Sequence, residues 1–161
     1  MPLAIDPENR AAALALCEGF ADLLEALVAG HVYRCGERPA PPTLAGVYVF
    51  SDGPDVVHVG RTRNLQTRRR NQTGLRNTRH VATHAFRRAT TAARAAHDDL
   101  PRTRDALERD PRFTPYFDAE KQYLRTLDLR CVELDDPPKQ AMFEIAASVA
   151  LGLPRELWRT S

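Results

Sequence analysis

The fold is decided by residues 45–60, which read AGVYVFSDGPDVVHVG. Aromatic and β-branched residues dominate 45–51 and 56–60, so both segments are predicted to be strands. Between them, Asp52-Gly53-Pro54-Asp55 has the composition of a turn. Two strands joined by a short turn make an antiparallel hairpin. In such a hairpin Tyr48 and His58 can lie near each other on one face.

Helices are predicted on both sides of the hairpin. Asp6-Pro7-Glu8 has the composition of a helix start, and apolar residues continue at helical spacing to a helix end near Gly30 to Val32. Pattern and capping residues predict further helices at 64–73, about 78–96, 102–109, 118–127 and 136–151, and a third strand at 127–134. This order predicts an α+β fold with a small three-stranded antiparallel sheet flanked by helices.

Positive charge is concentrated in one part of the chain. The formal net charge is only +2, but ten arginines lie between Arg61 and Arg94 with no Asp or Glu among them. Such a local field favours a polyanionic partner, and arginine grips phosphate with two parallel donors. Because Lys121 and Lys139 are the only lysines, a general preference for arginine explains the residue type. It does not explain the missing acids.

The remaining composition is that of a single soluble domain. The 161 residues are 43% hydrophobic, which is enough for one core. The start has no basic segment leading into an apolar one, and no apolar run approaches the roughly 20 residues of a membrane span. Three scattered cysteines suit free thiols in a reducing compartment. We therefore expect a cytoplasmic protein with no membrane partner.

Glu144 is the strongest chemical signal that comes from the residues alone. It is the only charged residue between Ala141 and Leu151, on a helix predicted to be nearly buried. A buried carboxylate is costly unless a metal ion, an arginine or other strong donors satisfy it. A divalent ion held by one carboxylate and a substrate phosphate would do so. A structural pair with a core arginine would do so as well, and the helix alone does not decide between them.

Three further side chains complete the groups that hydrolysis of a phosphodiester needs. Tyr48 or His58 could accept a proton from water, and His58 has the more suitable intrinsic pKa. Arg68 lies in a basic helix, and a guanidinium aimed at the scissile phosphate would stabilise the charge that develops there. In the simpler interpretation, Tyr48 is an ordinary strand aromatic, His58 is its solvated neighbour and Arg68 belongs to a basic face.

The order and local spacing of these residues resemble the GIY-YIG nuclease family. Gly46-Val47-Tyr48 resembles the GIY element with Val for Ile, and His58-Val59-Gly60 resembles the YIG element with His for Tyr. Arg68 follows Gly60 by eight positions, where the family carries its catalytic arginine. Residues 135–144 resemble the approach to the family's metal-binding glutamate, here Glu144.

The resemblance implies a metal-dependent endonuclease that hydrolyses phosphodiester bonds in DNA. Tyr48 and His58 would activate water, Arg68 would hold the phosphate and Glu144 would bind Mg²⁺ or Mn²⁺, so all four are expected to converge on one concave site. The GIY-YIG-like domain would span 45–154 with a helical insertion at about 76–126, between an N-terminal segment 1–44 and a tail 155–161. Two alternatives stay open: a non-catalytic nucleic-acid-binding module on the same fold, and an RNA-cleaving nuclease.

Basic and polar residues near the motifs are expected to contact the nucleic acid. His58 replaces the second tyrosine of the family, and Gln72 stands where many members carry a histidine, so the choice between Tyr48 and His58 as general base stays open. The N-terminal helix is expected to be a packing element or a contact to a second copy or another protein. The expected nucleic-acid contacts are Arg61, Arg63, Arg69, Gln72, Arg76, Arg79, His80, His84, Arg87 and Arg88.

Overall fold

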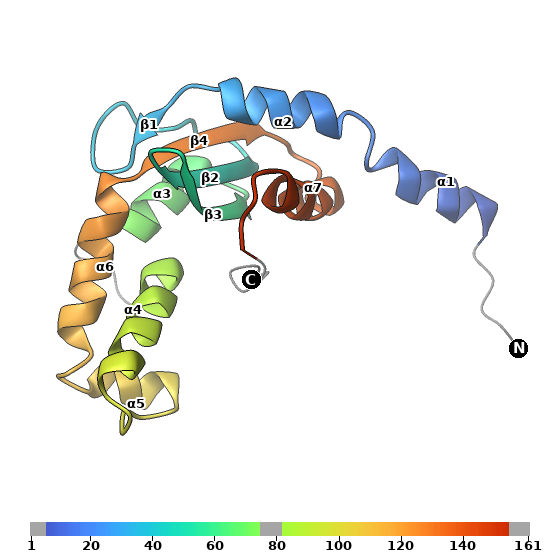
Figure 1. Ribbon diagram of the computed structural model, residues 1–161. Helices are drawn as coiled ribbons and strands as arrows, with labels where there is room; N and C mark the ends of the chain where they lie inside the picture. The colour runs from blue at the N-terminus through green and yellow to red at the C-terminus, as the bar shows by residue number, and fades with distance from the viewer. Residues whose placement is uncertain (1–5, 75–81, 155–161) are drawn as a thin grey trace, which may run out of the picture. The chain divides into compact units, whose positions relative to one another are not determined.

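The computed structural model describes residues 6–74 and 82–154 (Figure 1). Its α+β fold has a four-stranded antiparallel sheet flanked by helices, with the strand order β1-β4-β2-β3. The α+β class is confirmed, whereas the expected three strands are four. The added strand β1 has only two residues, too few to show an alternating pattern in the sequence. The strands are β1 (Tyr33–Arg34), β2 (Gly46–Asp52), β3 (Asp55–Thr62) and β4 (Asp128–Glu133).

Strands β2 and β3 form the antiparallel hairpin that the sequence predicts, with Tyr48 opposite Gly60. The register is regular from Gly46 to Phe50 and shifts only beyond Phe50. Successive side chains of a strand point to opposite faces. Val47 and Val49 therefore face one side of the hairpin, and Tyr48 and Phe50 face the other.

The valine face of the hairpin is covered by helix α7 (Pro137–Ala150). This helix packs against β3 and β2, and α2 (Phe20–Ala29) packs against α7 in turn. Phe143 and Ala147 of α7 share the core with the hairpin valines. The ring of Phe20 meets that of Phe143 edge-on, with the ring centroids 5.3 Å apart. The apolar side of α7 is thus fixed against the sheet, which sets the position of Glu144 on the same helix.

The N-terminal segment forms two helices where the sequence predicts one. Helix α1 (Pro7–Ala15) is capped by Asp6, whose carboxylate accepts the backbone N–H of Glu8 at 2.9 Å. Gly19 has φ +75°, a left-handed conformation that glycine adopts without strain, and α2 begins directly after it. Because the apolar spacing continues across this break, the pattern alone predicted a single helix.

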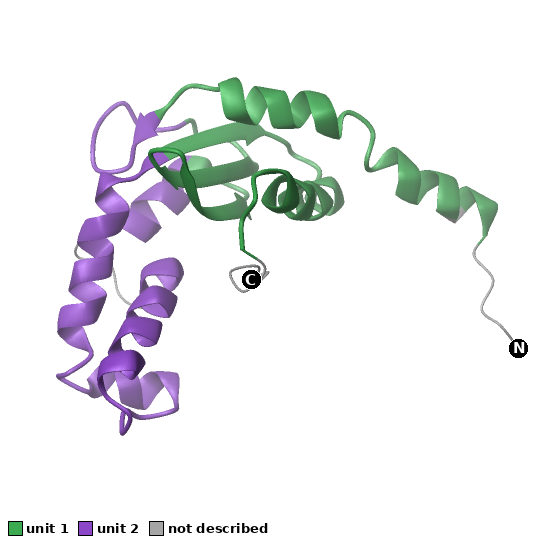
Figure 2. Cartoon of the chain, in the orientation of Figure 1, with its two compact units in different colours: residues 1–32, 42–65, 129–161 green, residues 33–41, 66–128 purple. Residues whose placement is uncertain are grey.

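The chain forms two compact units (Figure 2). Unit 1 comprises residues 1–32, 42–65 and 129–161 and holds the hairpin and α7. Unit 2 comprises 33–41 and 66–128, so the region of the expected helical insertion lies within it. None of the helices in the described residues is long and apolar enough to cross a membrane. The helices of unit 2 are α3 (Leu65–Thr73), α4 (Thr83–Ala96), α5 (Arg104–Arg109) and α6 (Thr114–Thr126). The first residue of α3, Leu65, is still counted in unit 1.

Unit 2 has an aromatic core between α4 and α6. Phe86 of α4 lies against Phe113 and Phe117, with ring centroids 5.1 and 6.5 Å away. Ala89 and Ala93, on the same side of α4, are fully buried, and such small residues let two helices approach closely. This core gives unit 2 packing of its own, as expected for a compact unit.

Candidate active site

Tyr48 of β2 and His58 of β3 lie against each other on one face of the hairpin. The Tyr48 hydroxyl is 3.4 Å from His58 Nε2, and the two ring centroids are 5.7 Å apart. The ring of Phe50 flanks both, at centroid distances of 5.3 and 6.1 Å. Tyr48 is only 3% exposed, whereas His58 is half-buried. His58 is therefore the member of the pair that solvent or a substrate reaches more easily.

Neither Gly46 nor Gly60 has room for a side chain. A Cβ atom on Gly60 would lie 2.6 Å from the Tyr48 hydroxyl oxygen and 2.8 Å from His58 Nε2, well inside normal contact distance. The absent side chain at Gly60 thus makes the room that both groups occupy. At Gly46 a Cβ atom would collide with the carbonyl oxygen of Val132 in β4. Gly60 therefore shapes the candidate site, and Gly46 lets two strands lie side by side.

Glu144 forms an ion pair with Arg61. The Arg61 Nε donates to Glu144 Oε2 at 3.0 Å, and the Glu144 side chain is only 10% exposed. The backbone of Glu144 is held as well, because Ser148 Oγ donates to its carbonyl oxygen at 2.7 Å. The buried carboxylate that the sequence predicts is present, and an arginine satisfies it. This is the structural partnership that the sequence left open beside metal binding.

The Tyr48–His58 pair and the Arg61–Glu144 pair lie on opposite faces of the hairpin. Gly60 is paired with Tyr48, and the next residue, Arg61, is paired with Val47. Cross-strand partners share a face, and Val47 packs in the core that includes α7, so Arg61 reaches Glu144 on the α7 side. The expected convergence of Glu144 with Tyr48 on one concave surface is therefore not seen. What the pairs share is β3, the outer strand in the sheet order.

Arg68 is half-buried on α3 and belongs to unit 2. On α3, Leu65 and Gln72 are buried, at 1% and 2% exposure. Arg68 follows Leu65 by three residues and precedes Gln72 by four, which puts it on the same stripe of the helix. Arg69 and Arg70 instead line a pocket. The three consecutive arginines thus have different surroundings, as the divergence of neighbouring helix positions requires.

Several of the expected nucleic-acid contacts have partners within the protein. Arg88 forms an ion pair with Glu120 and lies over the ring of Tyr123, 4.8 Å from its centroid. Gln72 Oε1 accepts the backbone N–H of His84 at 3.1 Å. Acids that the stretch 61–94 lacks are therefore supplied from elsewhere in the chain. Arg63 and Arg87 are exposed, whereas Arg76, Arg79 and His80 lie outside the described residues.

His84 is a neutral side chain at physiological pH. Burial, together with the positive charges of Arg88 and Arg87, lowers its pKa from 6.5 to about 4. A neutral imidazole offers a phosphate no net charge. The contact that the sequence predicts for His84 can therefore be at most a hydrogen bond from an uncharged ring.

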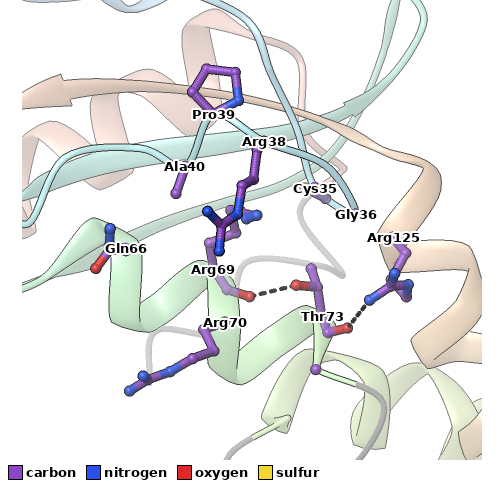
Figure 3. A pocket seen from close by; sticks show the side chains of 11 residues that line it. Cys35, Gly36, Arg38, Pro39, Ala40, Gln66, Arg69, Arg70, Thr73 and Arg125 are labelled. Atoms are coloured by element: carbon purple, nitrogen blue, oxygen red, sulfur yellow. Dashed lines mark hydrogen bonds between the residues drawn. The ribbon is translucent and has the colours of Figure 1, made fainter.

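A pocket of about 880 Å³ lies within unit 2 (Figure 3). Segment 33–41, α3 and the end of α6 contribute its lining residues. Arg38, Arg70 and Arg125 are among them, and none of the three was predicted from the sequence as a site residue. They are far apart along the chain and carry no motif, so only the folded structure brings them together.

Glu144 is the one expected metal ligand, and its chemistry fits a particular kind of ion. The described residues contain no group of three or more His, Cys, Asp or Glu side chains that could hold a metal. A single carboxylate is a hard oxygen ligand of the kind that Mg²⁺ combines with waters and substrate phosphates. The donor set therefore fits an ion shared with a substrate, and it does not fit a zinc site built from protein ligands alone.

Comparison with known proteins adds no relative. No protein-family model, curated protein or solved structure matches the chain.

Proposed function

We propose that the chain is a GIY-YIG-type nuclease that hydrolyses phosphodiester bonds in DNA. One observation carries the proposal: Tyr48 and His58, from two separate motifs, sit together over Gly60, the glycine of the second motif. A Tyr–His contact alone would mean little, because Tyr116 and His97 lie at the same 3.4 Å in unit 2, outside any motif. The steric need for a glycine beneath the pair distinguishes Tyr48 and His58 from that ordinary contact.

The pair supplies a proton acceptor for the attacking water. His58 is the more exposed partner and has the more suitable intrinsic pKa, so we assign it the general base. The Tyr48 hydroxyl, 3.4 Å from His58 Nε2, orients the imidazole that takes the proton from water. Arg68 holds the phosphate and stabilises the negative charge that accumulates on it.

Glu144 would hold the divalent ion, Mg²⁺ or Mn²⁺. When bound, such an ion stabilises negative charge on phosphate and leaving-group oxygens. Arg61 neutralises the Glu144 carboxylate in the described structure. Because its side chain is 35% exposed, Arg61 is able to turn from the carboxylate to a phosphate that arrives at β3. The arginine thereby keeps the buried carboxylate satisfied until a substrate is present.

A non-catalytic nucleic-acid-binding module is the second candidate. It is favoured by the Arg61–Glu144 pair itself, because an ion pair explains the buried carboxylate without any metal. The pair lies on the opposite face of the hairpin from Tyr48, which also favours the binding module. An RNA-cleaving nuclease would use the same residues as a DNA-cleaving one, and the choice of substrate separates the two.

Cleavage by matched variants tests the proposal. The purified chain is incubated with plasmid, single-stranded DNA and RNA, with and without Mg²⁺ or Mn²⁺. We expect metal-dependent cutting of DNA that falls by about 10²–10⁴-fold in His58→Ala, the range for loss of a general base, and falls clearly in Tyr48→Phe. Tyr116→Phe is the control, since it removes a hydroxyl from the same kind of contact. Binding without cutting of any substrate would refute the nuclease and favour the binding module.

A further inference from the structure

The pocket within unit 2 concentrates positive charge. Arg38, Arg69, Arg70 and Arg125 line it, and no Asp or Glu is among its lining residues. Cys35 also lines the pocket, and burial raises the pKa of its thiol to about 12 against the opposing effect of Arg69. The thiol is therefore uncharged at neutral pH. The lining side chains carry positive charge only.

Two of these arginines are held in place by groups that do not neutralise them. Arg69 Nη2 donates to the carbonyl oxygen of Glu37 at 2.7 Å, and Arg125 Nη1 donates to the carbonyl oxygen of Thr73 at 3.3 Å (the second bond is drawn in Figure 3). A carbonyl oxygen orients a guanidinium but carries no net charge. The buried Nε of Arg69 has no acceptor among the described residues, and a buried donor without an acceptor is unfavourable. The pocket thus holds oriented guanidinium groups that no acidic side chain among its lining residues neutralises.

We propose that this pocket binds the phosphate groups of a nucleic-acid strand. Each guanidinium offers paired N–H donors that match phosphate oxygens, and arginines from three segments can surround one phosphate or bridge two. Pro39 and Ala40 also line the pocket and add apolar surface to it. The volume of about 880 Å³ lies within the range of pockets that hold small ligands and is ample for one nucleotide unit. That the phosphate belongs to a strand rests on the proposed function, whereas the anion site does not.

Affinity measured against salt tests the proposal on the full chain. Binding of a labelled single-stranded DNA is measured by fluorescence anisotropy. EDTA is present, so metal-dependent cleavage does not affect the measured affinity. Arg38→Gln/Arg70→Gln removes two exposed pocket arginines. Arg102→Gln/Arg109→Gln is the control, because it removes the same charge from exposed positions of unit 2 outside the pocket. We expect the pocket variant to bind several-fold more weakly and its salt slope to fall by about 1.4, at about 0.7 for each lost single-strand phosphate contact. The control should change far less.

A charge-conserving variant excludes a folding artefact. Arg38→Lys/Arg70→Lys should keep the salt slope and lose part of the affinity, because lysine supplies the charge without the fork. Equal losses in the pocket and control variants would overturn the proposal in favour of a general basic surface. Competition by deoxyadenosine monophosphate as strong as that by the strand, at equal phosphate concentration, would overturn the assignment to a strand. A wild type that binds through the pocket and cuts nothing would refute only the nuclease.

Discussion

Removing either partner of the Arg61–Glu144 pair is expected to have unequal effects on stability. The Glu144 side chain is 10% exposed and that of Arg61 is 35% exposed. Arg61→Gln takes this partner from a nearly buried carboxylate, whereas Glu144→Gln leaves a guanidinium that reaches water. Breaking a fully buried pair costs about 3–5 kcal/mol and an exposed one about 0–1 kcal/mol. We therefore expect about 2 kcal/mol for Arg61→Gln and below about 1 kcal/mol for Glu144→Gln.

Urea unfolding of both single variants and of the double variant gives the coupling between them. The double variant should recover most of the stability that Arg61→Gln loses, because the buried carboxylate is then an uncharged amide. Equal losses in the two single variants, or losses that simply add in the double variant, would refute the reasoning. Contacts other than the ion pair with Arg61 would then satisfy the Glu144 carboxylate.

Adding Mg²⁺ to the same variants separates a metal ligand from a structural partner. If Glu144 binds the ion, Arg61→Gln should gain stability from Mg²⁺, about 1.4 kcal/mol at a concentration ten times the Kd, because its competitor is gone. Glu144→Gln should gain none. If Mg²⁺ stabilises neither variant, the ion pair is the whole role of Glu144 and the binding module becomes the first candidate.

Three more predictions address single residues. Gly60→Ala should lower the free energy of unfolding by about 1–3 kcal/mol, because its Cβ would lie 2.6 Å from the Tyr48 hydroxyl oxygen. The Tm should fall by about 2–4 °C for each kcal/mol, and an unchanged Tm would contradict this packing. His84 has a folded-state pKa of about 4 against 6.5 ordinarily, so the unfolded chain takes up the proton first and stability is lost as the pH falls from 6.5 towards 4. Urea unfolding at both ends of that range should show a loss of up to about 3 kcal/mol in the wild type that His84→Gln lacks, and an identical loss in the variant would assign it to other groups. Arg68→Ala should slow single-turnover cleavage more than it weakens binding, and equal effects would make Arg68 part of a plain electrostatic surface.

The sequence was sufficient to predict the hairpin because its signals are local. Alternating valines, a turn rich in Asp, Gly and Pro, and a following basic helix predicted β2, β3 and α3 to within one or two residues. The same pattern brought Tyr48 and His58 to one face, since register follows from the turn and the alternation. Helix α7 was predicted equally well, because Asp136 and the prolines after it mark its start.

The sequence could not predict contacts that depend on how distant segments meet. Arg61 and Glu144 are 83 residues apart, and nothing local indicates that this arginine faces α7. The ion pair of Arg88 with Glu120 is hidden in the same way, so the sequence predicts Arg88 as a nucleic-acid contact without showing its partner inside the protein. The pocket arginines on segment 33–41 and α6 lack any shared pattern. Local signals thus identified the catalytic candidates, and the folded chain decided their partners.

The placement of the two pairs limits how a nuclease of this chain could work. Tyr48 and His58 occupy one face of the hairpin, and Arg61 with Glu144 occupies the other, so a phosphate bound flat against either face would meet only half of the groups. Both sets can address one phosphodiester only if it lies along the outer edge of β3, where a group is approachable from both faces. A phosphate there would also compete with Glu144 for the guanidinium of Arg61. Binding of substrate would then free the Glu144 carboxylate to hold a metal ion. In a nuclease Arg61 would therefore exchange Glu144 for the phosphate, whereas in a binding module it would keep Glu144 as its partner.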